Sequence, residues 1–264
     1  MNTDRAAPRI FHSFEYHSAH YRVSAPDVKK IQRTIRRLRT SLEDYLKNTP
    51  EFARTLEPLS SLPEPVPDSA RRMHEASLLT GVGPMAAVAG TFAQMAVESC
   101  LGQIGQSDTS PSIRDNAECI VENGGDIFAV IRSPLTIGLW LGPDSPFNGL
   151  ALHLQPEETP LAVCSSSSVL GHSLSMGSCG LVTVISRDAS LADACATAIC
   201  NRIVSKKVLQ ESVESAMRIP GINGILAVKG DKMAVAGTLP ELIRHNDPEL
   251  TAKITRHDRS SFQS

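Results

Sequence analysis

The strongest constraint on the fold is the pattern at residues 119–154, where short apolar runs are broken by glycine and proline. Runs of this kind, rich in β-branched and aromatic residues, are typical of short strands in a sheet. Three or four antiparallel strands are therefore expected here. Similar patterns predict an opening hairpin at 10–24, a strand at 181–186 and a closing hairpin at 225–236, turned at Lys229-Gly230-Asp231.

Helical patterns stand between these β-like regions. Apolar side chains recur at steps of three or four residues from Val28 to Tyr45, which predicts a helix with one buried face. Three more helices are expected, at 69–79, from Pro84 to about Leu101 and from Leu191 to about Gln210. The prolines at 56–68 predict a surface connection. Groups of strands that alternate with groups of helices indicate an α+β protein.

The composition and net charge of the chain limit the kinds of partner that are expected. The chain has 26 basic and 28 acidic side chains, so its charge favours neither nucleic acid nor a membrane surface as a partner. No signal peptide or membrane span is readable, and the six cysteines form no C-x-x-C pair, so a cytoplasmic protein with reduced thiols is expected. One domain over residues 1–264 is expected, with flexible ends at 1–8 and 251–264.

The first candidate site is the segment Ser190-Leu191-Ala192-Asp193-Ala194-Cys195-Ala196-Thr197 at the start of a predicted helix. Asp193 and Thr197 are four residues apart, so their oxygens project from one face and could share a hard cation such as Mg²⁺. The alternative is structural, because Ser190 followed three residues later by Asp193 has the form of a capping box. Capping leaves Thr197 unexplained.

Two glycine-containing turns are further candidates. Asn123-Gly124-Gly125-Asp126 lies between two apolar β-like runs, and Asn-Gly alone is sufficient for a plain hairpin turn. Its glycines would also let backbone amides approach a ligand while Asp126 holds a polar group. Gly81 and Gly83 precede Pro84 at a predicted helix start, where free amides can hold an anion. Close helix packing explains those two glycines equally well.

A serine-rich segment at 164–177 contains Ser167, Ser168 and His172. A flexible polar loop and a lid over phosphate groups are the two interpretations of this hydroxyl density. The segment lacks the final glycine of a nucleophile elbow, and no acid is placed to orient His172, so a serine hydrolase is rejected. A zinc site formed by Cys164, His172 and Cys179 would have atypical spacing.

Four segments in a fixed order carry a resemblance to a known family: T-G-V-G-P-M-A-A-V-A-G, E-N-G-G-D-I, S-V-L-G-H-S-L-S-M-G and L-A-D-A-C-A-T-A. Together they resemble an uncharacterised bacterial and archaeal family that is itself similar to the FAD:protein FMN transferases, the ApbE-like proteins. The resemblance covers roughly residues 75–201. It implies a T-fold-like α+β fold, with antiparallel sheets and helices packed on one face.

The resemblance also implies a site. In the transferases a D-A-x-x-T segment supplies an aspartate and a threonine to Mg²⁺, and Asp193 and Thr197 resemble these two ligands. A backbone carbonyl near residues 84–86 would complete the metal site. The glycine-glycine-aspartate turn of the family lies beside the flavin nucleotide, which makes Gly124-Gly125-Asp126 the implied contact with FAD or FMN.

The chain also departs from the transferases. They carry a lysine where this chain has only Ala86, Ala87 and Val88, and they carry a long H-x-x-D-P segment where this chain has only Gly171-His172-Ser173. The leading hypothesis is a protein, monomeric or homo-oligomeric, that binds a flavin or related nucleotide with Mg²⁺ and transfers FMN, with His172 as proton carrier. The alternatives are a sulfur assimilation factor, acting in sulfide incorporation toward homocysteine, and a non-catalytic binding protein with a decayed site.

Overall fold

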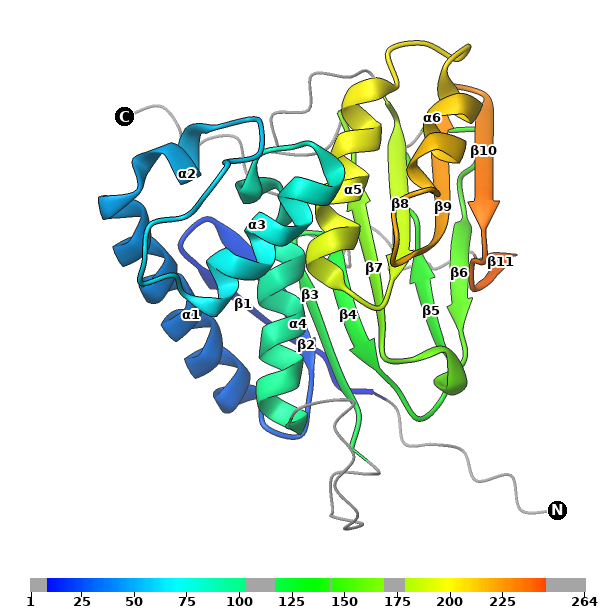
Figure 1. Ribbon diagram of the computed structural model, residues 1–264. Coiled ribbons are helices and arrows are strands. Elements are labelled where there is room, and N and C mark those ends of the chain that lie inside the picture. Colours follow the sequence, from blue (N-terminus) through cyan, green and yellow to red (C-terminus); the bar gives the residue numbers. More distant parts are fainter. Residues whose placement is uncertain (1–8, 103–116, 143, 169–178, 246–264) are drawn as a thin grey trace, which may run out of the picture.

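The computed structural model describes residues 9–102, 117–142, 144–168 and 179–245. Its centre is an eight-stranded sheet in which every neighbouring pair of strands is antiparallel (Figure 1). The strands, in their order across the sheet, are β1 (His12–Tyr16), β2 (Ala19–Ser24), β3 (Cys119–Asn123), β4 (Asp126–Val130), β7 (Leu161–Ser166), β8 (Leu181–Ser186), β9 (Ile222–Lys229) and β10 (Lys232–Gly237).

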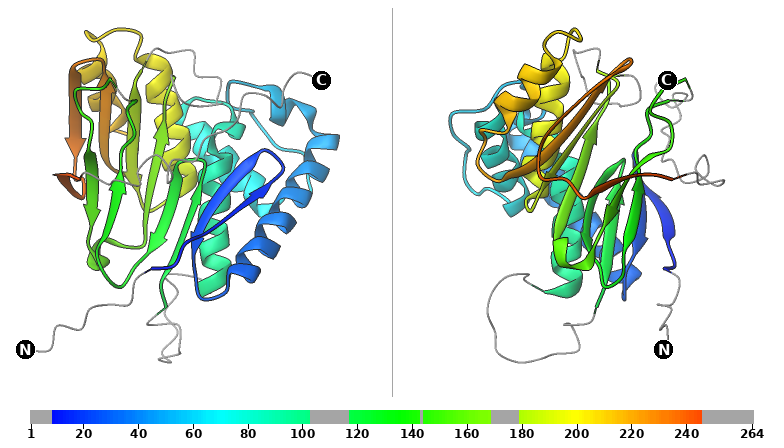
Figure 2. Two further views of the ribbon diagram at one scale, coloured as in Figure 1. Left: turned by 180° about the vertical axis from the view of Figure 1, so that it is seen from behind. Right: turned by 90° about the vertical axis from the view of Figure 1, so that its right-hand side faces the viewer.

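The helices cover one face of this sheet, as the right-hand view of Figure 2 shows. They are α1 (Val28–Asn48), α2 (Pro50–Arg54), α3 (Asp68–Thr80), α4 (Val88–Leu101), α5 (Ala189–Arg202) and α6 (Leu209–Ala216). Helix α4 packs on β3 and β4, and α5 packs on β7 and β8. The α+β arrangement of antiparallel strands with helices on one face is therefore confirmed.

A second, three-stranded sheet lies over the opposite face. Its strands run in the order β11 (Glu241–Arg244), β6 (Leu150–Leu154) and β5 (Leu135–Gly138). Neighbouring residues of one strand therefore enter different cores. Val121 packs among the helices, whereas Ile120 packs in a cluster with Leu152 and Leu154 of the second sheet. Because the central strands are buried on both faces, their sequences read as continuous apolar runs.

Several predicted elements are confirmed, and three are wrong in detail. The opening and closing hairpins form, and four strands lie within residues 119–154. The helix expected over 191–210 ends at Arg202, and a second helix, α6, begins at Leu209. This break lets α6 bury Leu209 and Val213 against β9 and β10.

The serine-rich segment is expected to be a loop or a lid, but its start lies in a strand. Its first three residues are the last three of β7, which lies between β4 and β8. Strand partners on both sides supply backbone hydrogen bonds, and the Ser165 hydroxyl lies 2.9 Å from the Thr183 hydroxyl. The third difference is at Pro84, which begins a 3₁₀ turn over Pro84–Ala87 before α4 starts at Val88.

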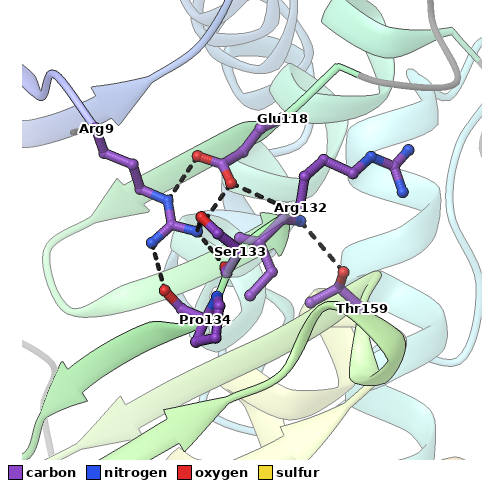
Figure 3. A network of polar contacts seen from close by, with 7 residues as sticks. Arg9, Glu118, Arg132, Ser133, Pro134 and Thr159 are labelled. Carbon is purple, nitrogen blue, oxygen red and sulfur yellow. Dashed lines mark hydrogen bonds and ion pairs between the residues drawn. The ribbon is translucent and has the colours of Figure 1, made fainter. Parts of the chain in front are cut away.

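A polar network ties the amino-terminal segment to the sheet (Figure 3). Arg9 donates through Nε and Nη2 to the two carboxylate oxygens of Glu118, at 2.6 and 2.9 Å. The same guanidinium donates to the carbonyl oxygens of Ser133 and Pro134. One side chain thereby holds three segments that are far apart in the chain.

No single helix in the described ranges is long and apolar enough to cross a membrane. The bent pair Asp68–Thr80 and Pro84–Leu101, at 107°, reaches that length and composition only when its two parts are counted together.

Candidate functional site

The Asn123–Asp126 segment forms the hairpin turn between β3 and β4. Asn123 and Asp126 are paired across the two strands, and the two glycines between them have positive φ values of 63° and 103°. Such a turn favours glycine at both central positions. Strand alternation places Asn123 on the same face as Val121, and Asp126 on the same face as Phe128, which is the face covered by helices.

Both polar side chains of this turn are buried and hydrogen-bonded. Asn123 Nδ2 donates to the carbonyl oxygen of Ala89 in the first turn of α4, at 3.1 Å. Asp126 Oδ1 accepts from the backbone N–H of Ser165 in β7, at 3.1 Å. The turn is therefore attached to α4 on one side and to the neighbouring strand on the other.

The side chain of Asp193, from α5, lies at the first turn of α4, to which Asn123 is also hydrogen-bonded. Its Oδ2 accepts from the backbone N–H of Gly90, at 2.9 Å, so the carboxylate lies at the amino-terminal end of α4. Free amides and the helix dipole favour negative charge at such an end. The capping box expected from Ser190 and Asp193 is not formed, because Asp188 is the N-cap of α5 and accepts from the amides of Ser190 and Leu191.

Glycine at position 90 makes this contact possible. A Cβ atom there would collide with the carbonyl oxygen of Ala189 and press on the Asp193 side chain. Without it, the start of α4 and the start of α5 come close enough for a direct hydrogen bond. The sequence analysis did not single out Gly90. The signal for it was the small-residue run that ends at that position.

Asp193 is close enough to Asp126 to affect the ionisation of Asp126. Burial raises the pKa of Asp193 to about 7, against the lowering effect of the hydrogen bonds from Gly90 and Ala89. Burial is also the main cause that raises the pKa of Asp126, and the charge of Asp193 adds to it. A buried acidic group of α5 therefore disfavours the negative charge of a second buried acidic group in β4.

The thiol of Cys164 completes this cluster. It is fully buried, lies 3.6 Å from the carbonyl oxygen of Ala189 and donates a hydrogen bond to Asp126. Burial raises its pKa, and the charges of Asp126 and Asp193 raise it further. We call Asn123, Asp126, Cys164 and Asp193 the carboxylate cluster.

Two hydroxyl side chains lie along the same helix–sheet interface. Thr197 is buried one turn after Asp193 in α5. Ser166 is on the same face of β7 as Cys164, and within the described residues its buried Oγ has no hydrogen-bond partner. A buried hydroxyl without a partner requires an explanation such as a bound water, ion or ligand.

The remaining predicted site residues lie in other surroundings. Gly81 ends α3 in a left-handed conformation, and Gly83 packs closely against the backbone of Thr55, so the packing interpretation of these glycines fits the structure better than an anion site. Ser167 donates to the Gly180 carbonyl oxygen, and Ser168 contacts the Cys200 thiol. The predicted proton carrier, at position 172, lies outside the described residues.

The carboxylate cluster contains carboxylate oxygens, which are the donors that hard cations prefer. Within the described ranges, no group of three or more histidine, cysteine, aspartate or glutamate side chains is arranged to hold a metal ion. Magnesium is usually bound by one or two carboxylates, with water and phosphate oxygens filling the other positions. Asp193 has one such carboxylate, and Thr197 has a hydroxyl four residues later in the same helix.

The chain is similar to proteins of known sequence and known structure. Residues 20–218 match the family described as AbpE bacteria. A UPF0280 protein of Methanocella arvoryzae is 42% identical over 226 residues, which are 85% of this chain and 86% of the relative. A UPF0280 protein of Methanothrix thermoacetophila is 40% identical over 207 residues, covering 78% and 81%.

Two solved structures share the fold. The flavinyl transferase ApbE of Pseudomonas stutzeri aligns with a TM-score of 0.54 at 12% identity, over 87% of this chain and 95% of that one. The flavin transferase ApbE of Vibrio cholerae aligns with a TM-score of 0.54 at 15% identity, over 89% and 98%. At this identity the likeness shows the fold alone.

Proposed function

This chain belongs to the ApbE-like family described as AbpE bacteria, and we propose that it binds a flavin nucleotide, or a related nucleotide, together with Mg²⁺ at the carboxylate cluster. The observation that carries this proposal is the burial of two carboxyl groups, Asp126 and Asp193, at one helix–sheet interface, near enough for the charge of Asp193 to disfavour ionisation of Asp126. Two buried carboxyl groups near each other are costly unless a proton or a cation neutralises their charge. A divalent cation would stabilise both charges at neutral pH.

Three groups of this chain would hold the cation. Asp193 supplies a carboxylate whose second oxygen is fixed by Gly90, and Thr197 supplies a hydroxyl one helical turn away. Asp126 supplies a second negative charge from the opposite layer. When bound, Mg²⁺ would polarise phosphate oxygens of the nucleotide and neutralise developing charge. The Ser166 hydroxyl has no hydrogen-bond partner among the described residues, so its oxygen is also available to a ligand at this interface.

We further propose FAD:protein FMN transfer as the reaction of this site, with the residue at position 172 as proton carrier. The two solved structures are of flavin transferases, and this chain shares their fold. The lysine expected from the family is missing near residues 86–88. Binding and transfer are therefore separate claims that need separate measurements.

The structure gives less support to the sulfur hypothesis. That alternative needs Cys164 or Cys179 to accept sulfur, but both thiols are fully buried. Burial raises the pKa of Cys164, and a hydrogen bond with Cys200 together with burial raises the pKa of Cys179. Nucleophilic thiols are typically exposed and have lowered pKa values.

The test is incubation of the purified protein with FAD and Mg²⁺, with AMP release followed by chromatography and FAD binding followed by calorimetry. We expect Mg²⁺-dependent binding, and AMP release if transfer occurs.

Asp193→Asn should abolish the Mg²⁺ dependence. Asp188→Asn is the matched control, because it changes a carboxylate five residues away on the same helix and keeps an oxygen for the cap. Absence of Mg²⁺-dependent nucleotide binding would sink the proposal, and binding without AMP would restrict it to a binding protein.

A further inference from the structure

Two thiols lie close together at the end of α4 and the start of β3, away from the carboxylate cluster. Cys100 is in the last turn of α4, and Cys119 is the first residue of β3. The two thiols are joined by a hydrogen bond, and α4 packs directly on β3. Cys119 is fully buried in the helix–sheet core, whereas Cys100 lies at its edge and is partly exposed.

The surroundings of Cys100 favour its thiolate. The backbone N–H of Asp27 donates to its sulfur, and Asp27 is the N-cap of α1, so the thiol lies at the amino-terminal end of that helix. Lys30 in the first turn of α1 adds positive charge, while the Asp27 carboxylate opposes it. Helix amino termini and cationic neighbours lower the pKa of a thiol.

The ionisation of the two thiols is therefore asymmetric. The hydrogen bond from Cys119 is the main cause that lowers the pKa of Cys100, to about 6, with smaller contributions from the Asp27 amide and Lys30. The same hydrogen bond and burial raise the pKa of Cys119. The partly exposed member of the pair is therefore the more readily ionised one and the buried member the less readily ionised one, as in a reactive thiol next to a resolving cysteine.

We propose that Cys100 and Cys119 form a peroxide-reactive dithiol that closes to an intramolecular disulfide. The Cys100 thiolate attacks one oxygen of hydrogen peroxide, the O–O bond breaks, and the other oxygen leaves as hydroxide and takes up a proton to form water. Cys100 is then a sulfenic acid. The Cys119 sulfur attacks it, the S–S bond forms and a second water leaves. Two thiols lose two electrons in total, and one peroxide gains them.

A comparison with the thiols of Cys179 and Cys200 shows which pair peroxide should oxidise first. Cys179 and Cys200 are also hydrogen-bonded to each other, and both contact Ser168, but both are fully buried. Burial and the hydrogen bond with Cys200 raise the pKa of Cys179. Contact between thiols is thus common to both pairs, and an accessible thiolate is found only in the pair of Cys100. We expect peroxide to oxidise that pair first.

The experiment treats the folded protein with about one equivalent of hydrogen peroxide at pH 7, blocks free thiols under denaturing conditions and digests with trypsin. Cleavage after Arg72, Arg114 and Arg132 puts the two cysteines on separate peptides, 73–114 and 115–132. We expect these peptides linked and 2 Da lighter than their sum. We also expect the oxidised protein to melt several degrees higher, because the bond closes a loop in the unfolded chain.

Two variants and one internal control make the result decisive. Cys119→Ser removes the resolving sulfur but keeps a hydroxyl that can donate to Cys100, so it should leave a sulfenic acid on Cys100 that dimedone traps, and Cys100→Ser should leave Cys119 unmodified. Peptides 133–187 and 188–202, which carry Cys179 and Cys200, should remain unlinked under the same treatment. The proposal is overturned if Cys100 stays fully alkylatable while peroxide is consumed, or if the 179–200 link forms as fast. Flavin binding does not enter either readout, so its failure leaves this result intact.

Discussion

Asp193 is subject to two opposing influences. Burial disfavours its negative charge, while the amides of Gly90 and Ala89 stabilise it. The balance is unfavourable, because the pKa of the folded state is raised from an ordinary value of 3.8 to about 7. Strongly shifted carboxyl groups concentrate at functional centres.

Asp193→Asn should therefore change how stability depends on pH when no divalent cation is present. In the wild type the folded state holds the proton longer than the unfolded state, so stability is lost as pH rises from about 4 to about 7, by at most about 1.4 kcal/mol per pH unit for one group. The asparagine variant has no such loss, and its amide oxygen can still accept from Gly90. Urea unfolding with EDTA at pH 4.5 to 8 measures the difference. Parallel curves for the two proteins would contradict the assignment.

At this scale, sequence spacing predicted only part of the site. Asp193 and Thr197 share a helix face because of helical periodicity, and this holds in α5. The approach of Asp126 depends on the packing of α5 across β4 and β7, which no local pattern encodes. The capping box failed for a local reason, because Asp188 comes two residues earlier than Ser190 and its oxygen binds the first free amides.

At the scale of the elements, side-chain carboxylates accept hydrogen bonds from amides in the first turns of α4 and α5. Asp188→Ala removes the acceptor for two amides at the start of α5, and we expect a loss of about 1 kcal/mol in the free energy of unfolding. Asp188→Asn retains an acceptor and should cost much less. Urea unfolding at pH 7 compares the three proteins. Equal losses in both variants would mean that charge, and not the cap hydrogen bonds, stabilises the helix.

The contact between the two helices gives a second prediction at this scale. Gly90→Ala adds a Cβ that collides with the backbone carbonyl of Ala189, and a backbone atom cannot move aside as a side chain can. We expect a net loss of about 1–3 kcal/mol, since overpacking outweighs the gain of about 1 kcal/mol in helix propensity. Glu75→Ala, on the exposed side of α3, is the control and should be nearly neutral. An unchanged melting temperature for the glycine variant would show that the helices separate easily.

Two of the three elements that sequence analysis placed wrongly share one cause. Ser165 and Ser166 lie in β7 because β4 and β8 pair with that segment, although a run of serines favours a loop by its own propensity. The end of α5 is similar, because the chain leaves the helix so that Leu209 can enter the core through α6. Tertiary pairing outweighed local preference at both places.

For the whole molecule, the class of fold was predictable and its layering was not. Short apolar runs separated by turns predict antiparallel strands wherever they occur. They do not reveal that β5 and β6 leave the main sheet and pair with β11 to cover its other face. Both sets of strands have buried apolar residues, so the assignment to sheets depends on contacts between distant parts of the chain.

The Arg9–Glu118 pair joins such distant parts and allows a test of how far the amino-terminal segment supports the fold (Figure 3). The pair is mostly shielded, with side-chain exposures of 15% and 21%, and its geometry is bidentate. We expect Arg9→Ala and Glu118→Gln each to cost about 1–3 kcal/mol, and the double variant to cost less than their sum. Arg9→Lys cannot form the double hydrogen bond and should fall between Arg9→Ala and the wild type.

The pH dependence of this pair runs opposite to that of Asp193. Burial raises the pKa of Glu118, but the hydrogen bond from Arg9 and the amide of Arg132 outweigh it, so the net pKa lies below the ordinary value of 4.5. The contribution is present above pH 4.5 and is lost as pH falls through the lower value of the folded state. The cost of Glu118→Gln should therefore be largest near pH 7 and shrink in acid. A cost that does not change between pH 7 and pH 3 would show that packing around the glutamine, and not the charge, accounts for the loss.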